Sequence, residues 1–236
     1  MRAILLAGGY GKRLKPITNK VPKCLVKINK IPLLEIWIKK LQKAKINEVL
    51  INTHYLSEEV ERFVKKKKFK IKIKLTHEKK LLGTAGTMLK NIDFYNGQDG
   101  FLIHADNFCE EPLVNLIKAH KKSPKKCLIT ALTFKTDNPS SCGIFKIDKK
   151  NIVQKFHEKP KRKKNFGNLA NGAVYLLKND FLNLAKKKFI KTKNFSEDII
   201  PNLKKKIYCY TTNKIFVDIG TKNNYMKVKN FNFRIR

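Results

Sequence analysis

The sequence predicts an α/β fold with a mixed, mainly parallel central sheet, and two observations lead to this prediction. In the first half, short apolar runs typical of buried strands alternate with segments whose apolar residues recur at helical spacing. In the second half, strand-like segments follow one another with few helices between them. Strands separated by helices form parallel sheets, whereas consecutive strands usually pair antiparallel. With 236 residues, 42% of them hydrophobic, the chain can bury a substantial core.

The first half supplies the elements of the parallel part. Residues 3–7 are apolar and predict a buried strand, and the stripe of Leu34, Trp37 and Leu41 predicts a helix over 33–44 with Trp37 in the core. Ser57 is a candidate N-cap, because acidic residues follow it in the first turn of a helix that ends near residue 66. The other expected elements of this half are strands at 49–52, 69–75 and 101–105 and helices at 84–90 and 111–121.

The second half is richer in strands. No Gly/Ser-rich linker, internal repeat or composition break divides it from the first half, so we expect a single domain over residues 1–236. Strands are expected at 127–134, 143–148, 152–157, 171–177, 207–211 and 215–217, and helices at 180–187, at 197–203 and from 222 onward.

The chain carries an extreme positive charge, with 53 Lys and Arg against 18 Asp and Glu, a net +35. Such a charge is typical of nucleic-acid-binding proteins, but no zinc-finger spacing, basic zipper or RNA-recognition motif is present. The densest basic runs, 65–74 and 159–164, are interpreted as solvated faces of structured segments. A basic nucleic-acid-binding module is therefore the alternative from another functional class, and nucleic acid is not the expected partner.

The lengths of the apolar runs predict the cellular location, and the number and spacing of the cysteines predict the state of their thiols. No apolar run approaches the roughly 18 residues that span a membrane, and the first run is too short for a signal peptide, so we expect a cytoplasmic protein without a membrane partner. The cysteines are odd in number and form no CxxC pair, which predicts isolated thiols rather than disulfides or a zinc site. They are Cys24, Cys109, Cys127, Cys142 and Cys209.

The first strand runs into a glycine loop that is followed by cations. Without a Cβ, Gly8, Gly9 and Gly11 allow backbone N–H groups to approach phosphate oxygens closely. Arg13 can hold a phosphate through two N–H groups, and Lys23 adds a point charge. The stretch therefore predicts a phosphate site.

Two widespread phosphate motifs do not fit this loop. The dinucleotide fingerprint needs glycine or alanine at its last position, where GYGKRL has leucine. The Walker loop needs serine or threonine after its Gly–Lys pair, and here arginine follows.

The opening stretch LAGGYGKRLKPITNKVPKCLVKINKIPLLE (6–35) instead resembles that of the sugar-nucleotide pyrophosphorylases, which are sugar-1-phosphate nucleotidyltransferases. Further stretches similar to that family follow in order along nearly the whole chain: LLGTAGTM (81–88), HADN (104–107), SSCGIFKID (140–148), FHEKP (156–160), NLANGAVYLL (168–177) and VDIGT (217–221). The resemblance implies a three-layer Rossmann-like nucleotide-diphospho-sugar transferase fold. It also implies that residues 1–110 mainly bind nucleotide and 111–236 mainly bind sugar phosphate, with no C-terminal β-helix domain.

In the reaction implied by the resemblance, an oxygen of a sugar 1-phosphate attacks the α-phosphorus of a nucleoside triphosphate and pyrophosphate leaves. Arg13 would hold the leaving phosphates, Lys23 would contact the α-phosphate or the pyrophosphate, and Asp106 would complete the catalytic set. Asp106 and Asp218 would bind Mg²⁺, which prefers carboxylate oxygens. The structural alternative is that each aspartate caps the helix that follows it.

The resemblance also implies two groups of substrate-binding residues. The nucleotide-binding residues are Ala7, Gly8, Gly9, Gly11, Gly83 and Gly86. The sugar-phosphate-binding residues are Gly143, Glu158, Lys159 and Asn171. Two structural alternatives stay open here, a surface ion pair of Glu158 with Lys159 and a turn satisfied by Asn171. His104, His54 and Tyr55 border these stretches and are further candidates for substrate contact.

The LGTAG loop at 82–86 is most similar to that of mannose-1-phosphate and heptose-1-phosphate guanylyltransferases. GTP and a hexose or heptose 1-phosphate are therefore the favoured substrates, and Glu78 could accept guanine N–H groups. A uridylyl-, thymidylyl- or cytidylyltransferase of the same fold stays open. A sensor of sugar nucleotides without activity is disfavoured, because such a protein would be free to lose the metal carboxylates and this chain keeps both Asp106 and Asp218. A homodimer is compatible with the expected strand and helix edges.

Overall fold

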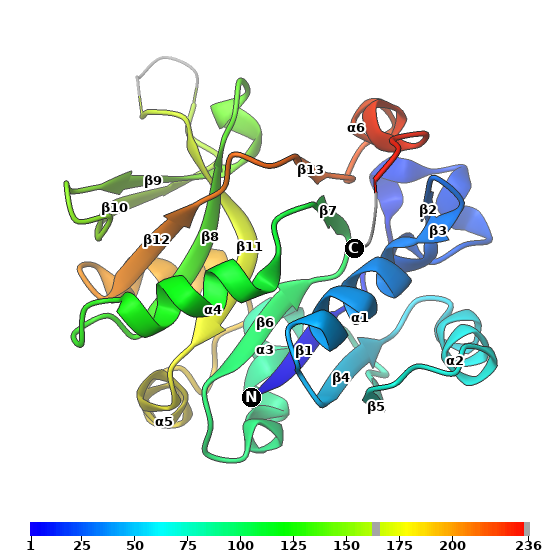
Figure 1. Ribbon diagram of the computed structural model, residues 1–236, viewed down its shortest axis with the longest axis horizontal. Helices are drawn as coiled ribbons and strands as arrows, with labels where there is room; N and C mark the ends of the chain where they lie inside the picture. Colours follow the sequence, from blue (N-terminus) through cyan, green and yellow to red (C-terminus); the bar gives the residue numbers. More distant parts are fainter. Residues whose placement is uncertain (162–165, 234–236) are drawn as a thin grey trace. The chain divides into compact units, whose positions relative to one another are not determined.

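The computed structural model describes residues 1–161 and 166–233 (Figure 1). The chain divides into two compact units. Unit 1 contains Met1–Leu81, Ile103–Leu113 and Lys214–Arg236, and unit 2 contains Leu82–Leu102 and Val114–Asn213. Because the chain returns to unit 1 twice, these boundaries do not follow the expected halves 1–110 and 111–236. The assignment of nucleotide and sugar functions to those halves of a single domain stays a prediction.

Unit 1 contains the parallel strands. β1, β4 and β5 pair in register and in parallel, and β6 lies on the other side of β1. The interiors of β1 and β4 are apolar and buried, as expected for strands covered on both faces. The strands are β1 (Arg2–Leu6), β4 (Glu48–Thr53), β5 (Lys72–His77) and β6 (Gly100–His104), which also reaches into unit 2. The helices are α1 (Leu33–Lys43), α2 (Ser57–Lys66) and α6 (Lys222–Val228).

Short elements fill the connections of unit 1. The segment after β1 forms three 3-10 helices at Lys12–Leu14, Ile17–Asn19 and Lys23–Leu25. A small hairpin of β2 (Lys27–Ile28) and β3 (Ile31–Pro32) follows. The two-stranded sheet of β7 (Asn107–Cys109) and β13 (Phe216–Asp218) joins distant parts of the chain.

Unit 2 is built mainly from antiparallel strands. β11 pairs with β8 and β9, β9 pairs with β10, and β12 runs parallel to β8. An isolated bridge between Ile152 and Tyr208 links the start of β10 to β12. The strands are β8 (Ile129–Lys135), β9 (Gly143–Ile147), β10 (Val153–Glu158), β11 (Leu169–Leu177) and β12 (Ile207–Thr211). The helices are α3 (Gly83–Lys90), α4 (Leu113–Lys122), α5 (Asn179–Lys188), a π-helix at Phe195–Ile199 and 3-10 helices at Ile92–Tyr95, Pro139–Ser141 and Ile200–Leu203.

The predicted α/β fold is confirmed: nine of the described strands form one mixed sheet with helices on both sides, and Trp37 is buried in the core. The prediction of Ser57 as an N-cap is wrong, because Ser57 is already the first helical residue. The residue before it, Leu56, has φ 49° and there is no side-chain cap. The strand expected at 69–75 begins at Lys72 and extends to His77.

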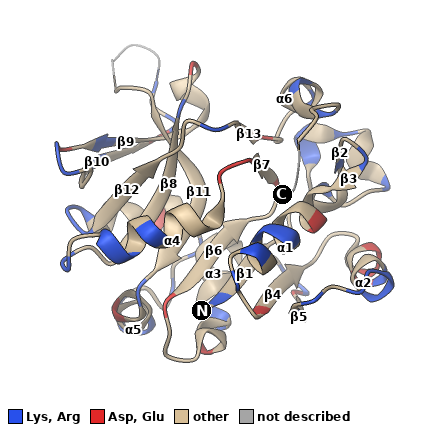
Figure 2. Ribbon diagram, viewed as in Figure 1, with Lys and Arg blue, Asp and Glu red and all other residues tan. Residues whose placement is uncertain are grey.

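The charge is spread along the chain, since Lys and Arg occur on most helices and in many loops of both units (Figure 2). The lysines of the basic run 65–74 are exposed, as expected. In the run 159–164, Lys159 and Lys161 are exposed and residues 162–164 lie outside the described part. All five cysteines are free thiols, four of them buried. Over the described residues, no helix is long and apolar enough to cross a membrane.

Candidate active site

Three charged side chains predicted to act together meet in unit 1. The ammonium nitrogen of Lys23 lies 2.6 Å from Oδ2 of Asp106 and 3.6 Å from Oδ1 of Asp218. The Lys23 side chain is 9% exposed, whereas those of Asp106 and Asp218 are 35% and 43% exposed. Both carboxylates therefore face one cation and keep part of their surface open to a ligand.

The pairing of β7 with β13 explains how the two aspartates meet. Asp218 at the end of β13 stands opposite Asn107 at the start of β7, and Asp106 immediately precedes Asn107. The indole N–H of Trp37 on α1 donates to the carbonyl of Asn107, at 2.9 Å. A three-residue strand thus fixes the aspartates, and the sequence pattern was too short to predict it.

A buried apolar cluster lies beneath this charged group. Leu14 is adjacent to Arg13, Ile219 is adjacent to Asp218, and Phe108 follows Asp106 by two positions; all three side chains are buried in the same cluster. The cluster also includes residues of the β2 strand and of α1 and α6. Close packing of these side chains holds the backbone that carries the charged groups.

Burial and neighbouring charges shift the pKa values of Lys23 and Asp106. Burial alone would lower the pKa of Lys23, but the carboxylates of Asp106 and Asp218 outweigh it and raise that pKa above its ordinary value. Burial would raise the pKa of Asp106, but the neighbouring Lys23 holds it below the ordinary value. At neutral pH Lys23 is therefore an ammonium and Asp106 a carboxylate.

The donor set fits a magnesium ion bound together with phosphate. Among the described residues, no group of three or more His, Cys, Asp and Glu side chains could hold a metal. Mg²⁺ is usually held by only one or two carboxylates together with water and substrate phosphates, which is what Asp106 and Asp218 can offer. Neither aspartate caps the next helix, since Thr221 caps α6 and the Asp106 side chain contacts Lys23.

His104 lies at the end of β6, beside this group. Its Nε2 is buried and has no hydrogen-bond partner among the described residues. Burial lowers the pKa of His104, although the charge of Asp106 opposes that shift. The imidazole is therefore neutral at neutral pH.

The space around each glycine of the loop differs. Gly11 has φ +63°, and a Cβ there would lie 2.8 Å from the methyl group of Thr18, so only glycine fits. A Cβ at Gly8 would lie 3.0 Å from the amide nitrogen of Asn52. A Cβ at Gly9 would meet nothing within 4 Å. The backbone at Gly9 is thus open to a ligand.

Arg13 joins the same group through Gly220. A Cβ added at Gly220 would lie 2.7 Å from Nη2 of Arg13 and 3.0 Å from Oδ1 of Asp218. The guanidinium therefore lies against the backbone of Gly220, beside the carboxylate. Gly220 is not among the residues expected from the sequence, although its place within VDIGT was the available signal.

A hydrogen-bonded network lies at the ends of β1, β4 and β5. The N–H of Ala7 donates to Oδ1 of Asn52 at 2.8 Å, and Nδ2 of Asn52 donates to Oε1 of Glu78 at 3.1 Å. Glu78 is only 2% exposed, so its Oε1 is engaged inside the protein rather than open to a guanine ring. Asn52 was missed by the sequence analysis, because its role depends on contacts between strands.

In unit 2, Gly83 and Gly86, which are predicted to bind nucleotide, lie beside the backbone of Lys193. Gly83 has φ +79°, and a Cβ there would collide with the carbonyl oxygen of Lys193. The same carbonyl accepts the N–H of Ala85 at 2.8 Å, and the Gly86 N–H lies 3.4 Å from it. Packing thus accounts for Gly83, and the contact of both glycines with nucleotide stays a prediction.

Two predicted sugar residues meet across β9 and β10. Glu158 stands opposite Gly143 in the register, and a Cβ at Gly143 would lie 2.8 Å from Oε2 of Glu158 and 2.5 Å from the ring of Phe156. Glycine at position 143 makes room for the carboxylate. The exposed Lys159 follows with its Nζ 3.5 Å from Glu158, which is the surface ion pair considered above.

Asn171 lies in β11, where the register against β8 shifts before Tyr175. Its Oδ1 accepts the N–H of Ala173 at 3.0 Å, and its Nδ2 donates to the hydroxyl of Tyr175 at 2.6 Å. Burial raises the pKa of Tyr175, and the charge of Glu158 acts in the same direction. The side chain of Asn171 thus makes hydrogen bonds within the irregular part of β11, and its contact with sugar stays a prediction.

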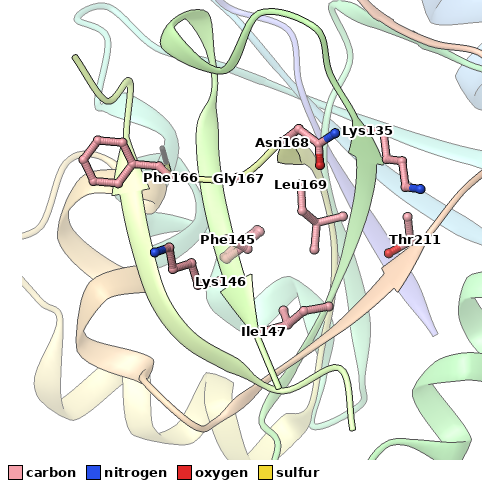
Figure 3. Close-up of a pocket in the computed structure, with 9 residues that line it drawn as sticks. All are labelled: Lys135, Phe145, Lys146, Ile147, Phe166, Gly167, Asn168, Leu169 and Thr211. Atoms are coloured by element: carbon pink, nitrogen blue, oxygen red, sulfur yellow. The ribbon is translucent and has the colours of Figure 1, made fainter. Parts of the chain in front are cut away.

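A pocket of about 510 Å³ opens elsewhere in unit 2 (Figure 3). Its described lining combines apolar side chains of β9 and β11 with the cations Lys135 and Lys146. None of the predicted sugar-binding residues is among the described residues that line it.

Comparison with known proteins shows the family to which the chain belongs. The family model described as nucleotidyl transferase matches residues 2–234. A D-glycero-alpha-D-manno-heptose 1-phosphate guanylyltransferase of Campylobacter jejuni is 32% identical over 228 residues, which are 95% of this chain and 97% of that protein. The mannose-1-phosphate guanylyltransferase catalytic subunit beta of Xenopus tropicalis is 34% identical over 165 residues, 68% of this chain and 45% of that protein. The mannose-1-phosphate guanyltransferase of Saccharomyces cerevisiae is 29% identical over 96% of this chain, which spans 63% of that protein.

Solved structures show the same fold. HddC from Yersinia pseudotuberculosis, complexed with GMP-PN, superposes with a TM-score of 0.79 at 22% identity, covering 96% of this chain and 97% of that chain. A UDP-glucose pyrophosphorylase complexed with UDP-glucose gives a TM-score of 0.80 at 18% identity, covering 97% of this chain and 96% of that chain. The match of the family model over almost the whole sequence establishes that the chain belongs to the nucleotidyl transferase family.

Proposed function

We propose that the protein transfers a nucleoside monophosphate from a nucleoside triphosphate to a sugar 1-phosphate, with Mg²⁺, and releases pyrophosphate. One observation carries this proposal: Arg13, Lys23, Asp106 and Asp218 gather in unit 1 in the same region as a glycine loop. A triphosphate needs both cations for its oxygens and carboxylates for its metal ion, and this group provides both.

The proposed reaction needs no covalent intermediate with the protein. A phosphate oxygen of the sugar 1-phosphate attacks the α-phosphorus in line, the bond from that phosphorus to the bridging oxygen breaks, and pyrophosphate leaves with the electron pair. The attacking oxygen is already an anion, so no strong general base is needed. Positioning and neutralisation of charge are then the main contributions of the side chains.

The cations have separate tasks in this proposal. Arg13 binds the leaving β- and γ-phosphates through two N–H groups, while Lys23 contacts the α-phosphate. Asp106 and Asp218 hold the Mg²⁺, which neutralises charge on the phosphoryl oxygens when it is bound. The ammonium of Lys23 already lies 2.6 Å from Asp106 and 3.6 Å from Asp218, and its charge keeps Asp106 ionised.

The residues of unit 2 are proposed to bind the sugar phosphate. Glu158, held over Gly143, is an acceptor for sugar hydroxyls, and Asn171 is an additional polar contact. Lys159 is exposed and free to turn from Glu158 toward a phosphate, since ion pairs at the surface are weak.

We propose GTP as the nucleotide and a manno-configured hexose or heptose 1-phosphate as the sugar substrate. The support is the LGTAG loop together with the names of the relatives, which are mannose-1-phosphate and heptose-1-phosphate guanylyltransferases. Uridylyl, thymidylyl and cytidylyl transfer are the competing outcomes of the test.

A grid of four nucleoside triphosphates against several sugar 1-phosphates, with pyrophosphate release as the readout, tests this function. We expect release with GTP and manno-configured sugars and only in the presence of Mg²⁺. Release with another nucleoside triphosphate would support nucleotidyl transfer but contradict the choice of GTP. Folded protein that releases no pyrophosphate in any combination would contradict the proposal.

The role of Arg13 can be tested separately in the same assay. Arg13→Ala should lower kcat about 100-fold or more, because it removes a group that stabilises charge in the transition state. Arg62→Ala is the matched control, since Arg62 is an exposed arginine of α2 that pairs only with Glu59 among the described contacts. An Arg13→Ala rate close to that of the control would reduce Arg13 to a loop residue.

A further inference from the structure

Tyr10 is the one residue of the glycine loop, Gly8 to Gly11, that carries a side chain. Glycine backbones explore many conformations, so a loop of this composition needs contacts from elsewhere to hold one shape. Tyr10 is 42% exposed, yet its side chain makes directed contacts. These contacts indicate how the loop is held.

The hydroxyl of Tyr10 is hydrogen-bonded to His54, which follows β4. Its oxygen lies 2.9 Å from Nε2 of His54, and Nδ1 of the same ring lies 2.6 Å from the carbonyl oxygen of Glu78. Because a carbonyl can only accept, Nδ1 carries the proton, and in the neutral ring Nε2 is the acceptor. Tyr10 therefore donates its hydroxyl proton to an imidazole whose tautomer is fixed by Glu78.

Aromatic packing reinforces this bond. The rings of Tyr10 and His54 meet edge to face with centroids 5.2 Å apart, and the ring of Tyr55 lies 5.6 Å from that of Tyr10. The hydroxyl of Tyr55 donates to the carbonyl of Thr18 at 3.0 Å, and the hydroxyl of Thr18 donates to the carbonyl of Gly11 at 2.8 Å. The end of the loop at Gly11 is thus fixed as well.

At the other end of the loop, Gly8 packs closely against the same histidine and Asn52. A Cβ at Gly8 would lie 3.3 Å from Cβ of His54 and 3.0 Å from Nδ2 of Asn52. Only Gly9, between these two fixed ends, has open space where a Cβ would be. Gly9 is thus open to a ligand, while the residues on either side of it in the loop, Gly8 and Gly11, are held by neighbouring side chains.

We propose that the Tyr10–His54 hydrogen bond sets the shape of the glycine loop for the triphosphate, and that Tyr10 and His54 are positioning residues. This inference rests on the proposed function, in which the loop binds the phosphates of the nucleotide. Neither residue needs to touch the reacting atoms. A loop held in advance binds a ligand more tightly because less ordering accompanies binding.

Three substitutions isolate this bond. Tyr10→Phe removes only the hydroxyl, and His54→Asn keeps an amide that can donate to the Glu78 carbonyl but has no atom at the position of Nε2, which accepts from Tyr10. The third protein combines both changes. Tyr208→Phe is the control, because Tyr208 lies on β12 in unit 2.

Two readouts are needed: the Kd of GTP with Mg²⁺, measured by calorimetry without sugar phosphate, and the steady-state constants for pyrophosphate release. Tyr10→Phe should raise the Kd and KM of GTP about fivefold to tenfold, the effect of losing one hydrogen bond. The kcat, the KM of the sugar phosphate and the melting temperature should stay unchanged. The double variant should be no weaker than His54→Asn alone, because both changes remove the same bond.

Tyr10→Phe protein with the GTP affinity of the control would overturn the inference and leave the proposed function intact. An equal loss in the KM values of both substrates, or additive effects in the double variant, would also overturn it. If GTP binds but no pyrophosphate is released with any sugar, the proposed function fails and the ratio of Kd values still decides the inference. Wild-type protein that binds no nucleoside triphosphate would contradict both.

Discussion

At the scale of residues, the glycine loop shows that three glycines in one motif can be required for different reasons. Gly11 is needed for its backbone conformation, Gly8 for packing against the ends of neighbouring strands, and Gly9 for neither. Because nothing in the described protein occupies the space at Gly9, a substitution there reports on a ligand rather than on the fold.

Gly9→Ala should leave the free energy of unfolding within about 0.5 kcal/mol of wild type and raise the Kd of the nucleoside triphosphate. Gly11→Ala should instead lose about 1–3 kcal/mol of stability, because alanine at φ +63° is strained and meets Thr18. Urea unfolding and calorimetric binding of both proteins provide the measurement. Unchanged nucleotide affinity in Gly9→Ala would separate the loop from the phosphate site.

The sequence was sufficient to select the residue types of the charged group. Lys23, Asp106, Asp218 and Arg13 were all singled out from motifs, and the structure brings them together in unit 1. Asn52 and Gly220 were not singled out. Their importance depends on what lies opposite them in space, and that information is absent from a single sequence without the pairing of strands.

At the scale of elements, helix termini in this protein depend on residues distant in the sequence. The backbone N–H of Asn179, the first residue of α5, donates to Oδ1 of Asp99 at 2.8 Å. The other oxygen of Asp99 lies 3.2 Å from Nε2 of the buried His120, whose Nδ1 is 2.8 Å from the hydroxyl of Thr130. Asp99 thus links α4, α5 and β8 within unit 2.

Asp99→Ala should lower the free energy of unfolding by about 1–2 kcal/mol at pH 7, because it removes a helix cap and leaves His120 without its carboxylate. The hydrogen bond from His120 lowers the pKa of Asp99 below its ordinary 3.8, so the contribution is complete above that pH. It should disappear as the pH falls through the lowered pKa.

Urea unfolding of Asp99→Ala and wild type between pH 3 and 7 measures this difference. The exposed Asp137 is the control, as Asp137→Ala should cost nothing at either end of the range. A difference between wild type and Asp99→Ala that persists unchanged at pH 3 would show that the carboxylate charge is not its source.

Elements with long apolar or helical patterns were predictable, and those fixed by tertiary contacts were not. β1, α1 and β12 lie within a residue or so of their expected ranges, because their patterns are strong. β7 has three residues and is stable through its pairing with β13 and the bond from Trp37. The wrong prediction of Ser57 as the N-cap of α2 has the same origin. A serine before acidic residues does not show that Leu56 adopts a left-handed conformation and that the helix already begins at Ser57.

At the scale of the whole molecule, the two units divide the proposed work. Unit 1 contains the glycine loop and the charged group with its apolar cluster, and unit 2 contains Glu158, Gly143 and Asn171. The net charge of +35 is spread over both units, which suits the attraction of anionic substrates and requires no single basic face.

The central claim is that Asp106 and Asp218 act as one magnesium site with Lys23 between them. The most direct measurement is the rate of Mg²⁺-dependent pyrophosphate release by Asp106→Asn and Asp218→Asn, each checked for an unchanged circular dichroism spectrum. We expect both variants to lose about 100-fold or more in rate, because the metal's charge is no longer held at the phosphates. A near wild-type rate in either folded variant, at the Mg²⁺ concentration that half-saturates the wild type, would contradict the account.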